Sequence, residues 1–144
     1  MQLFDLSNKI TQTILTPELK QWIINGLAKH AIDQTGIDGL KEEAILFEIR
    51  DNQNLAGCVA IQIFWGQLHI KMLFVEENYR AQGFARALME HAFEFGKTKR
   101  CNFAFVETMN FQAPDFYQKL GFKIDFIRDG YAKETSFYYL SKEL

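Results

Sequence analysis

The segment of residues 75–88 contains the residue pattern with the most specific chemistry. It reads VEENYRAQGFARAL, so an apolar stretch is followed by a polar turn and then by small residues. Arg80, Gly83 and Ala85 stand where a helix is expected to begin. The first turn of a helix has free backbone N–H groups and the positive end of the helix dipole, and a glycine there lets a ligand approach the backbone closely. This start favours phosphate or diphosphate binding, with Arg86 as a second nearby cation.

A plain strand-to-helix turn with a solvated arginine is the alternative interpretation of this segment. The segment has neither the Gly-Lys-Ser/Thr ending of a P-loop nor the GxGxxG fingerprint of dinucleotide-binding folds. The pattern taken alone therefore leaves both interpretations open.

A second segment, residues 110–122, reads NFQAPDFYQKLGF and places Ala113 three and Tyr117 seven positions after Asn110. Together the two segments resemble the GNAT superfamily of acyl-CoA-dependent N-acetyltransferases. Residues 80–85, RAQGFA, match the family's R/Q-x-x-G-x-G/A motif with Ala as the last residue. Residues 110–122 match its N-x-x-A-x-x-x-Y-x-x-x-G-F segment, and the order of expected strands agrees from about residue 44 onward.

The resemblance implies that acetyl-CoA lies between two parallel strands that splay apart, residues 68–75 and 101–108. The pantetheine arm would pair with backbone of the first strand, the diphosphate would lie on the N–H groups at the helix start, and Asn110 would bond the arm. Core packing is the alternative for the strand residues, and a turn-forming role is the alternative for Asn110. The cofactor contacts that the resemblance implies are Leu73, Val75, Arg80, Ala81, Gln82, Gly83, Phe84, Ala85 and Asn110.

The implied reaction is direct attack of an amine on the thioester carbonyl, through a tetrahedral intermediate. An alkyl ammonium with a pKa near 10.4 is neutral in only about one molecule in a few thousand at pH 7, so a proton must be removed. Tyr117 matches the position of the family's general acid, which would protonate the departing sulfur. Its alternative role is that of an aromatic side chain packed under the sheet. A backbone N–H near Val75 is the candidate donor to the oxyanion.

Three candidates for the general base remain open. His69 occupies a position where some family members carry a carboxylate, and in an unbroken strand it would share a face with Lys71, whose charge favours the neutral imidazole. Glu107, near the end of the neighbouring strand, is the rival, either as base or as the anion that holds a cationic substrate. An ordered water is the third, and a structural or exposed role is the alternative for His69.

The elements that must position these residues follow from hydrophobic periodicity and turn residues. The first ten residues are expected to form an edge strand or an extended lead-in, and Thr16 with Pro17 is typical of a helix start. The resulting fold class is α+β, with a mixed sheet of six or seven strands, helices on both faces, and one domain over residues 1–144. The remaining elements are a helix to about 34–39, a hairpin of 44–50 and 55–65, a strand at 68–75, a helix at 83–97, a strand at 101–108, a helix at 114–120, and strands 122–128 and 137–144 joined by a turn at Asp129-Gly130.

Composition excludes several other classes of protein. The 144 residues are 48 % apolar and 24 % charged, which is ordinary for one globular domain. The net charge of −2 gives no overall field that would attract nucleic acid or an anionic membrane. No apolar run approaches the ~20 residues of a membrane helix. Cys58 and Cys101 are expected to be reduced thiols of a cytoplasmic protein, and no metal-ligand spacing is present, so no metal is expected.

The sequence therefore predicts an acetyl-CoA-dependent N-acetyltransferase acting on a small-molecule or protein amine. The alternative is a non-catalytic acyl-CoA-binding module on the same fold. Acetylation of aminoacyl-tRNA is a weaker candidate because it needs a basic surface. The acceptor would be selected by the N-terminal helix, by the loop of residues 34–43 that follows it, and by the turn of residues 128–134. A homodimer is among the expectations because dimers are common in the family.

Overall fold

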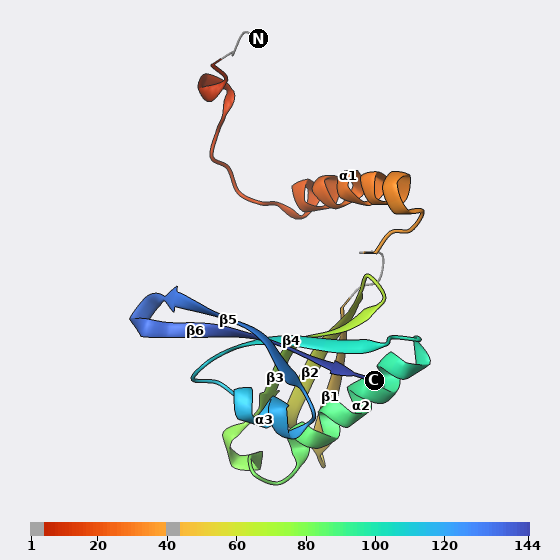
Figure 1. Cartoon of the computed structure of the whole chain (residues 1–144), viewed down its shortest axis with the longest axis vertical. Coiled ribbons are helices and arrows are strands. Elements are labelled where there is room, and N and C mark those ends of the chain that lie inside the picture. Colours follow the sequence, from red (N-terminus) through yellow and green to blue (C-terminus); the bar gives the residue numbers. More distant parts are fainter. Residues whose placement is uncertain (1–4, 40–43) are drawn as a thin grey trace. The chain divides into compact units, whose positions relative to one another are not determined.

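The structure is a computed structural model that describes residues 5–39 and 44–144 of the chain. The chain divides into two compact units, residues 1–38 and 39–144, which are described separately below. Figure 1 shows the elements of each unit along the sequence.

The N-terminal unit consists of a 3-10 turn, η1 (Ser7–Lys9), and one long helix, α1 (Pro17–Thr35). The Thr16 hydroxyl accepts a hydrogen bond from the backbone N–H of Leu19 at 3.2 Å, and Pro17 occupies the first helical position, as the sequence predicts. The helix ends at Gly36, which adopts a left-handed conformation with φ of 83°. The described part of the first ten residues, from residue 5 onward, contains η1 and no strand, so the edge-strand alternative for it is wrong.

The C-terminal unit is built on one six-stranded mixed sheet with the order β1-β2-β3-β4-β6-β5. All neighbouring strands are antiparallel except β3 and β4, which are parallel. This arrangement confirms the predicted mixed sheet. The strands are β1 (Ile45–Asp51), β2 (Asn54–Phe64), β3 (Gln67–Val75), β4 (Phe103–Met109), β5 (Lys123–Tyr131) and β6 (Thr135–Glu143).

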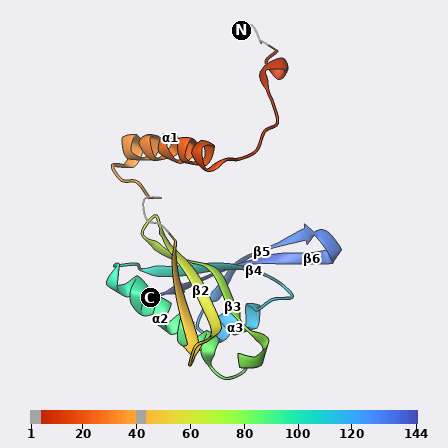
Figure 2. The same cartoon turned by 180° about the vertical axis from the view of Figure 1, so that it is seen from behind.

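Two helices of this unit, α2 (Phe84–Thr98) and α3 (Pro114–Lys119), cover the same face of the sheet (Figures 1 and 2). The ring of Phe122, just after α3, lies 5.9 Å from Phe93 of α2 and 5.6 Å from Tyr117 of α3. The core between helices and sheet is apolar, which anchors α2 and α3 relative to β3 and β4. A helix on the second face of the sheet stays a prediction, because the remaining helix, α1, belongs to the other unit. The largest fully buried side chains are Ile61, Leu68, Ile70, Met89, Leu140 and Val59.

The central parallel strands separate after a short stretch of pairing. β3 and β4 are paired at only three positions, of which the last joins Ile70 to Val106. Ile61 and Ala60 are consecutive residues of β2, but their partners in β3, Ile70 and Met72, are two positions apart. Lys71 is therefore an extra residue, a β-bulge, located where β3 leaves β4.

The bulge changes which residues of β3 face the helices. Leu68 and Ile70 are buried before it, whereas Leu73 and Val75 pack against the core after it. An unbroken strand would have placed His69 and Lys71 on the same face, but the strand is broken at Lys71 and that premise does not hold.

The last hairpin differs from the sequence prediction. β5 continues through Asp129 and Gly130 to Tyr131, and the chain reverses in a 3-10 turn, η3 (Ala132–Glu134). The pairing of β5 with β6 shifts register between Arg128 and Tyr131. The Asp-Gly pair therefore produces an irregularity inside a strand rather than the predicted turn, because glycine accommodates a bulge as readily as a reversal.

None of the helices in the described parts of the chain is long and apolar enough to cross a membrane.

Candidate active site

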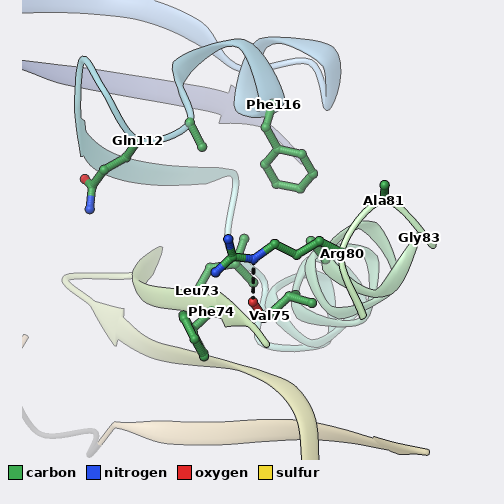
Figure 3. A pocket seen from close by; sticks show the side chains of 10 residues that line it. Leu73, Phe74, Val75, Arg80, Ala81, Gly83, Gln112 and Phe116 are labelled. Atoms are coloured by element: carbon green, nitrogen blue, oxygen red, sulfur yellow. Dashed lines mark hydrogen bonds between the residues drawn. The ribbon is translucent and has the colours of Figure 1, made fainter. Parts of the chain in front are cut away.

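A cavity of about 480 Å³ lies between the end of β3, the start of α2 and the loop before α3 (Figure 3). Its walls are apolar side chains and backbone, with one charged side chain. Six of the nine predicted cofactor residues line it: Leu73, Val75, Arg80, Ala81, Gly83 and Ala85. The remaining lining residues are Phe74, Gln112, Ala113 and Phe116.

The start of α2 is open at this cavity. Gly83 is the N-cap residue, with φ of 87°, and no side chain caps the helix there. The first helical hydrogen bond runs from the N–H of Ala87 to the carbonyl of Gly83 at 3.0 Å, so the N–H groups before Ala87 have no partner within the helix. A Cβ at position 83 would meet no atom within 4 Å, which shows that the space beside it is clear. This arrangement can accept an anion.

The loop before α2 holds its shape through local contacts. Ala81 adopts a left-handed conformation with φ of 60°, which is uncommon for a residue with a side chain and typical of ligand-binding loops. The Gln82 amide donates to the carbonyl of Asn78 at 3.1 Å, and the Phe84 ring packs edge-on against Tyr79. Neither Gln82 nor Phe84 lines the cavity with its side chain, and only their backbone N–H groups are candidates for ligand contact.

The backbone of β3 beyond the bulge faces the gap between the splayed strands. The N–H of Glu76 donates to Ala56 of β2 at 2.8 Å. Because backbone groups alternate along an antiparallel strand, Leu73 and Val75 direct theirs away from β2. The carbonyl of Val75 accepts a hydrogen bond from Arg80 Nε at 3.0 Å, drawn in Figure 3. The Val75 carbonyl is therefore occupied by Arg80, while the N–H of Val75 and the backbone groups of Leu73, which lie beyond the last β3–β4 pair, remain available to an extended ligand.

A second cavity, of about 250 Å³, lies where β3 and β4 diverge. It shares Leu73, Gln112 and Ala113 with the larger cavity, so the two cavities adjoin, and together they are called the groove below. Its walls carry reactive side chains as well as apolar ones. The lining residues are Ile70, Lys71, Met72, Leu73, Val106, Glu107, Thr108, Gln112, Ala113 and Tyr117.

Tyr117 brings a phenol to this second cavity from α3. The residue is only 6 % exposed, and burial raises the pKa of its hydroxyl to about 12. The hydroxyl makes no hydrogen bond with any other residue that the structure describes, so it is available to a ligand. It is protonated throughout the physiological pH range and can act as a proton donor.

His69 and Glu107, the two rival candidates for the base, are hydrogen-bonded to each other. His69 Nε2 lies 2.8 Å from Glu107 Oε2, and both side chains are partly buried. The imidazole stacks on the Phe105 ring, with centroids 4.4 Å apart and planes at 5°. Glu107 lines the second cavity, whereas His69 lies behind it. The sequence showed both residues but not their contact, which depends on the β3–β4 register that sets His69 opposite Phe105.

Asn110 is not brought to either cavity. Its side-chain oxygen accepts from the N–H of Ser136 at 3.1 Å, and its own N–H donates to the Ser136 carbonyl at 2.9 Å. Its predicted contact with a cofactor stays a prediction. Gln112, two positions later, lines both cavities instead. Sequence reasoning missed it because it occupies an unspecified position of the motif.

The described residues include no group of three or more His, Cys, Asp or Glu side chains that could hold a metal ion. Cys58 and Cys101 are not joined in a disulfide.

The fold and the groove define a class of protein that comparison with known sequences identifies. The model of the GNAT acetyltransferase family matches residues 11–122, and the chain belongs to this family. It is 34 % identical over 95 residues to the blasticidin-S acetyltransferase of Streptomyces morookaense. The aligned region covers 62 % of this chain and 67 % of that protein.

Solved structures agree on the fold. The crystal structure of an acetyltransferase from Bacillus cereus superposes with a TM-score of 0.80 at 22 % identity, over 95 % of this chain and 99 % of that one. A streptothricin acetyltransferase structure from Bacillus anthracis, determined in complex with acetyl-CoA, matches 70 % of this chain and 63 % of that one, with a TM-score of 0.65 and 20 % identity.

Proposed function

We propose that this protein transfers the acetyl group of acetyl-CoA to an amine, and that residues 1–144 make up one GNAT domain. The observation that carries the proposal is the pair of adjoining cavities, which extend from the open start of α2, past the end of β3, to Tyr117. Family membership supports the reaction class. The match to residues 11–122 begins in the N-terminal unit and ends in the C-terminal unit, which supports a single domain.

The groove fits the parts of acetyl-CoA in order. The diphosphate would lie on the free N–H groups after Gly83, where the helix dipole favours negative charge, with Arg80 adding a cation. The pantetheine arm would add to the edge of β3 through the backbone of Leu73 and Val75. The bound cofactor supplies an activated acetyl group as a thioester. Its acyl end would lie in the smaller cavity beside Tyr117.

Tyr117 would supply the proton that the departing CoA sulfur needs. Its phenol has no partner among the described residues, and because burial raises its pKa to about 12, it carries its proton when the thiolate departs. Positioned acid catalysis of this type is typically worth 10²–10⁴ in rate.

Glu107 and His69 would remove the proton from the attacking ammonium. Glu107 lines the cavity and makes the contact with the amine, while His69 orients the carboxylate and shares the proton through their 2.8 Å hydrogen bond.

Calorimetry with coenzyme A and a thiol-release assay on a panel of amines test the proposal. The panel comprises polyamines, aminoglycosides, amino acids and N-terminal peptides. We expect coenzyme A to bind in the low micromolar range or tighter, and acetyl-CoA to release thiol only when an accepted amine is present. Absence of coenzyme A binding would overturn the proposal. Binding without turnover on any amine of the panel would favour the non-catalytic alternative.

A further inference from the structure

We infer that Gln112 holds the arm of acetyl-CoA, by donating a hydrogen bond from its side-chain amide where the two cavities meet. This inference rests on the proposed function, because it concerns how the same groove holds its cofactor. It assigns to Gln112 the contact that the sequence motif assigns to Asn110.

Gln112 lies on the route between the two ends of the groove. Only Leu73, Gln112 and Ala113 line both cavities, and Gln112 is the one with a polar side chain. A ligand that extends from the start of α2 to Tyr117 must pass these three residues. Figure 3 shows Gln112 on the loop before α3, with its amide end turned away from Phe116 and Arg80.

The amide of Gln112 is fixed by two hydrogen bonds to its oxygen. The N–H of Met109 donates to Gln112 Oε1 at 2.8 Å, and the hydroxyl of buried Thr108 donates to the same atom at 3.3 Å. A backbone N–H can only donate, so the atom that faces it must be the oxygen of the amide. The NH₂ group therefore points the other way, and it makes no hydrogen bond to any residue within the described ranges.

An oriented donor in this place suits the chemistry of the pantetheine arm. The arm contains two amide groups, and each carbonyl needs a donor once water is displaced from the groove. The backbone of β3 would satisfy one side of the arm, and Gln112, which lines both cavities, would donate to it from the loop before α3. Asn110 has the same type of side chain, but its oxygen is used by Ser136 and it lines neither cavity.

Two variants separate this contact from a structural role. Gln112→Glu keeps an oxygen for the N–H of Met109 but loses the donor, whereas Gln112→Leu loses both without adding a charge. We expect coenzyme A affinity, measured by calorimetry, to fall about fivefold to tenfold in each variant. The matched probe is 3′-phospho-ADP, which carries the diphosphate but no arm, and its affinity should change less than about twofold. Gln118→Leu, the matched amide removal at an exposed residue of α3 that lines neither cavity, should keep the wild-type affinity for coenzyme A.

The outcomes distinguish this inference from the proposed function. If the wild-type protein binds both probes and Gln112→Glu binds coenzyme A as tightly as the wild type, the inference on Gln112 is wrong while the proposed function stands. An equal loss of affinity for both probes would also overturn it, because the effect would then not involve the arm. If the wild-type protein binds neither probe, the proposed function itself fails. Should Gln112→Leu not fold, Gln112→Glu still decides, since it keeps the contact with Met109.

Discussion

The two cavities of the groove are lined by different kinds of chemical groups. The larger one is outlined by apolar side chains, the backbone of β3 and the uncapped start of α2, with Arg80 as its charged group. The smaller one carries Glu107, Lys71, Thr108 and Tyr117. A wall of backbone can hold a ligand but offers no side chain for acid–base catalysis, whereas carboxylate and phenol groups can act as proton acceptor and donor in a reaction. We therefore expect changes in the larger cavity to alter affinity and changes in the smaller cavity to alter rate.

Replacing Tyr117 with Phe gives the largest expected effect. The proton donor is lost while the ring remains, so turnover should fall about 10²–10³-fold. Coenzyme A affinity should stay within about twofold of the wild-type value, because the hydroxyl lies in the smaller cavity, where changes are expected to alter the rate. Steady-state thiol release and calorimetry on the same preparation measure the two quantities.

Because burial raises the pKa of Tyr117 to about 12, the phenol stays protonated and the wild-type protein should show no alkaline loss of rate from this group below about pH 11.

Turnover in Tyr117→Phe equal to that of the wild type would remove the hydroxyl from the mechanism. Equal loss of affinity and rate would erase the distinction between the two cavities.

Removing the carboxylate of the His69–Glu107 pair is the next most severe change. Glu107→Gln should lower kcat/KM about tenfold to hundredfold with little change in coenzyme A affinity, since the group contacts the amine rather than the cofactor. Glu48→Gln is the matched control, because Glu48 forms a 2.8 Å ion pair with Arg50 on the surface. It should leave kcat/KM unchanged.

A double-mutant cycle then tests whether His69 and Glu107 act as a unit. If they do, the variant with both Glu107→Gln and His69→Gln should be no slower than the slower single variant. If the losses of rate in the two single variants instead multiply in the double variant, the two side chains act independently and do not share a proton as we propose.

A side chain at the start of α2 tests the larger cavity. Gly83→Ala places a methyl group in the left-handed conformation, which costs about 1 kcal/mol, and it projects into the space assigned to the diphosphate. We expect about tenfold weaker coenzyme A binding with unchanged turnover at saturation. Gly36→Ala has the same backbone cost, since Gly36 has φ of 83° and equally open surroundings. It should keep the wild-type affinity, and an equal loss there would refute the role of Gly83.

The smallest expected effect is that of the charge beside the larger cavity. Arg80→Gln should weaken coenzyme A binding about threefold, because the guanidinium is exposed and screened by solvent. Arg86→Gln removes a cation that pairs with Glu90 and lines neither cavity, and it should have no measurable effect. The difference between the two variants should shrink when calorimetry is repeated at high salt.

The sequence predicted those parts of the molecule that depend on local chemistry. Thr16 and Pro17 start α1, and Gly83 starts α2, because capping and left-handed conformations are properties of single residues and their neighbours. The six strands also follow from short apolar runs bounded by polar turns. The turn of the last hairpin was misplaced because an Asp-Gly pair serves both reversals and bulges, and only the pairing partner decides which one forms.

The parts of the site that depend on strand register could not be predicted in the same way. The contact between His69 and Glu107 joins residues 38 positions apart, and it exists because β3 and β4 align at His69 and Phe105. The role of Gln112 depends on where its loop places the amide relative to Met109. Neither relationship leaves a periodic signal in the sequence, since each results from long-range packing.

The extra residue at Lys71 limits how this protein can diverge. Substitutions along β3 each alter one side chain, but loss of a single codon at position 71 would exchange the outward and inward faces of everything from Met72 to Val75. Leu73 and Val75 would then leave the core and the exposed Met72 and Phe74 would enter it. Relatives of this protein are therefore expected to preserve the number of residues in the strand even where the identity of residue 71 changes.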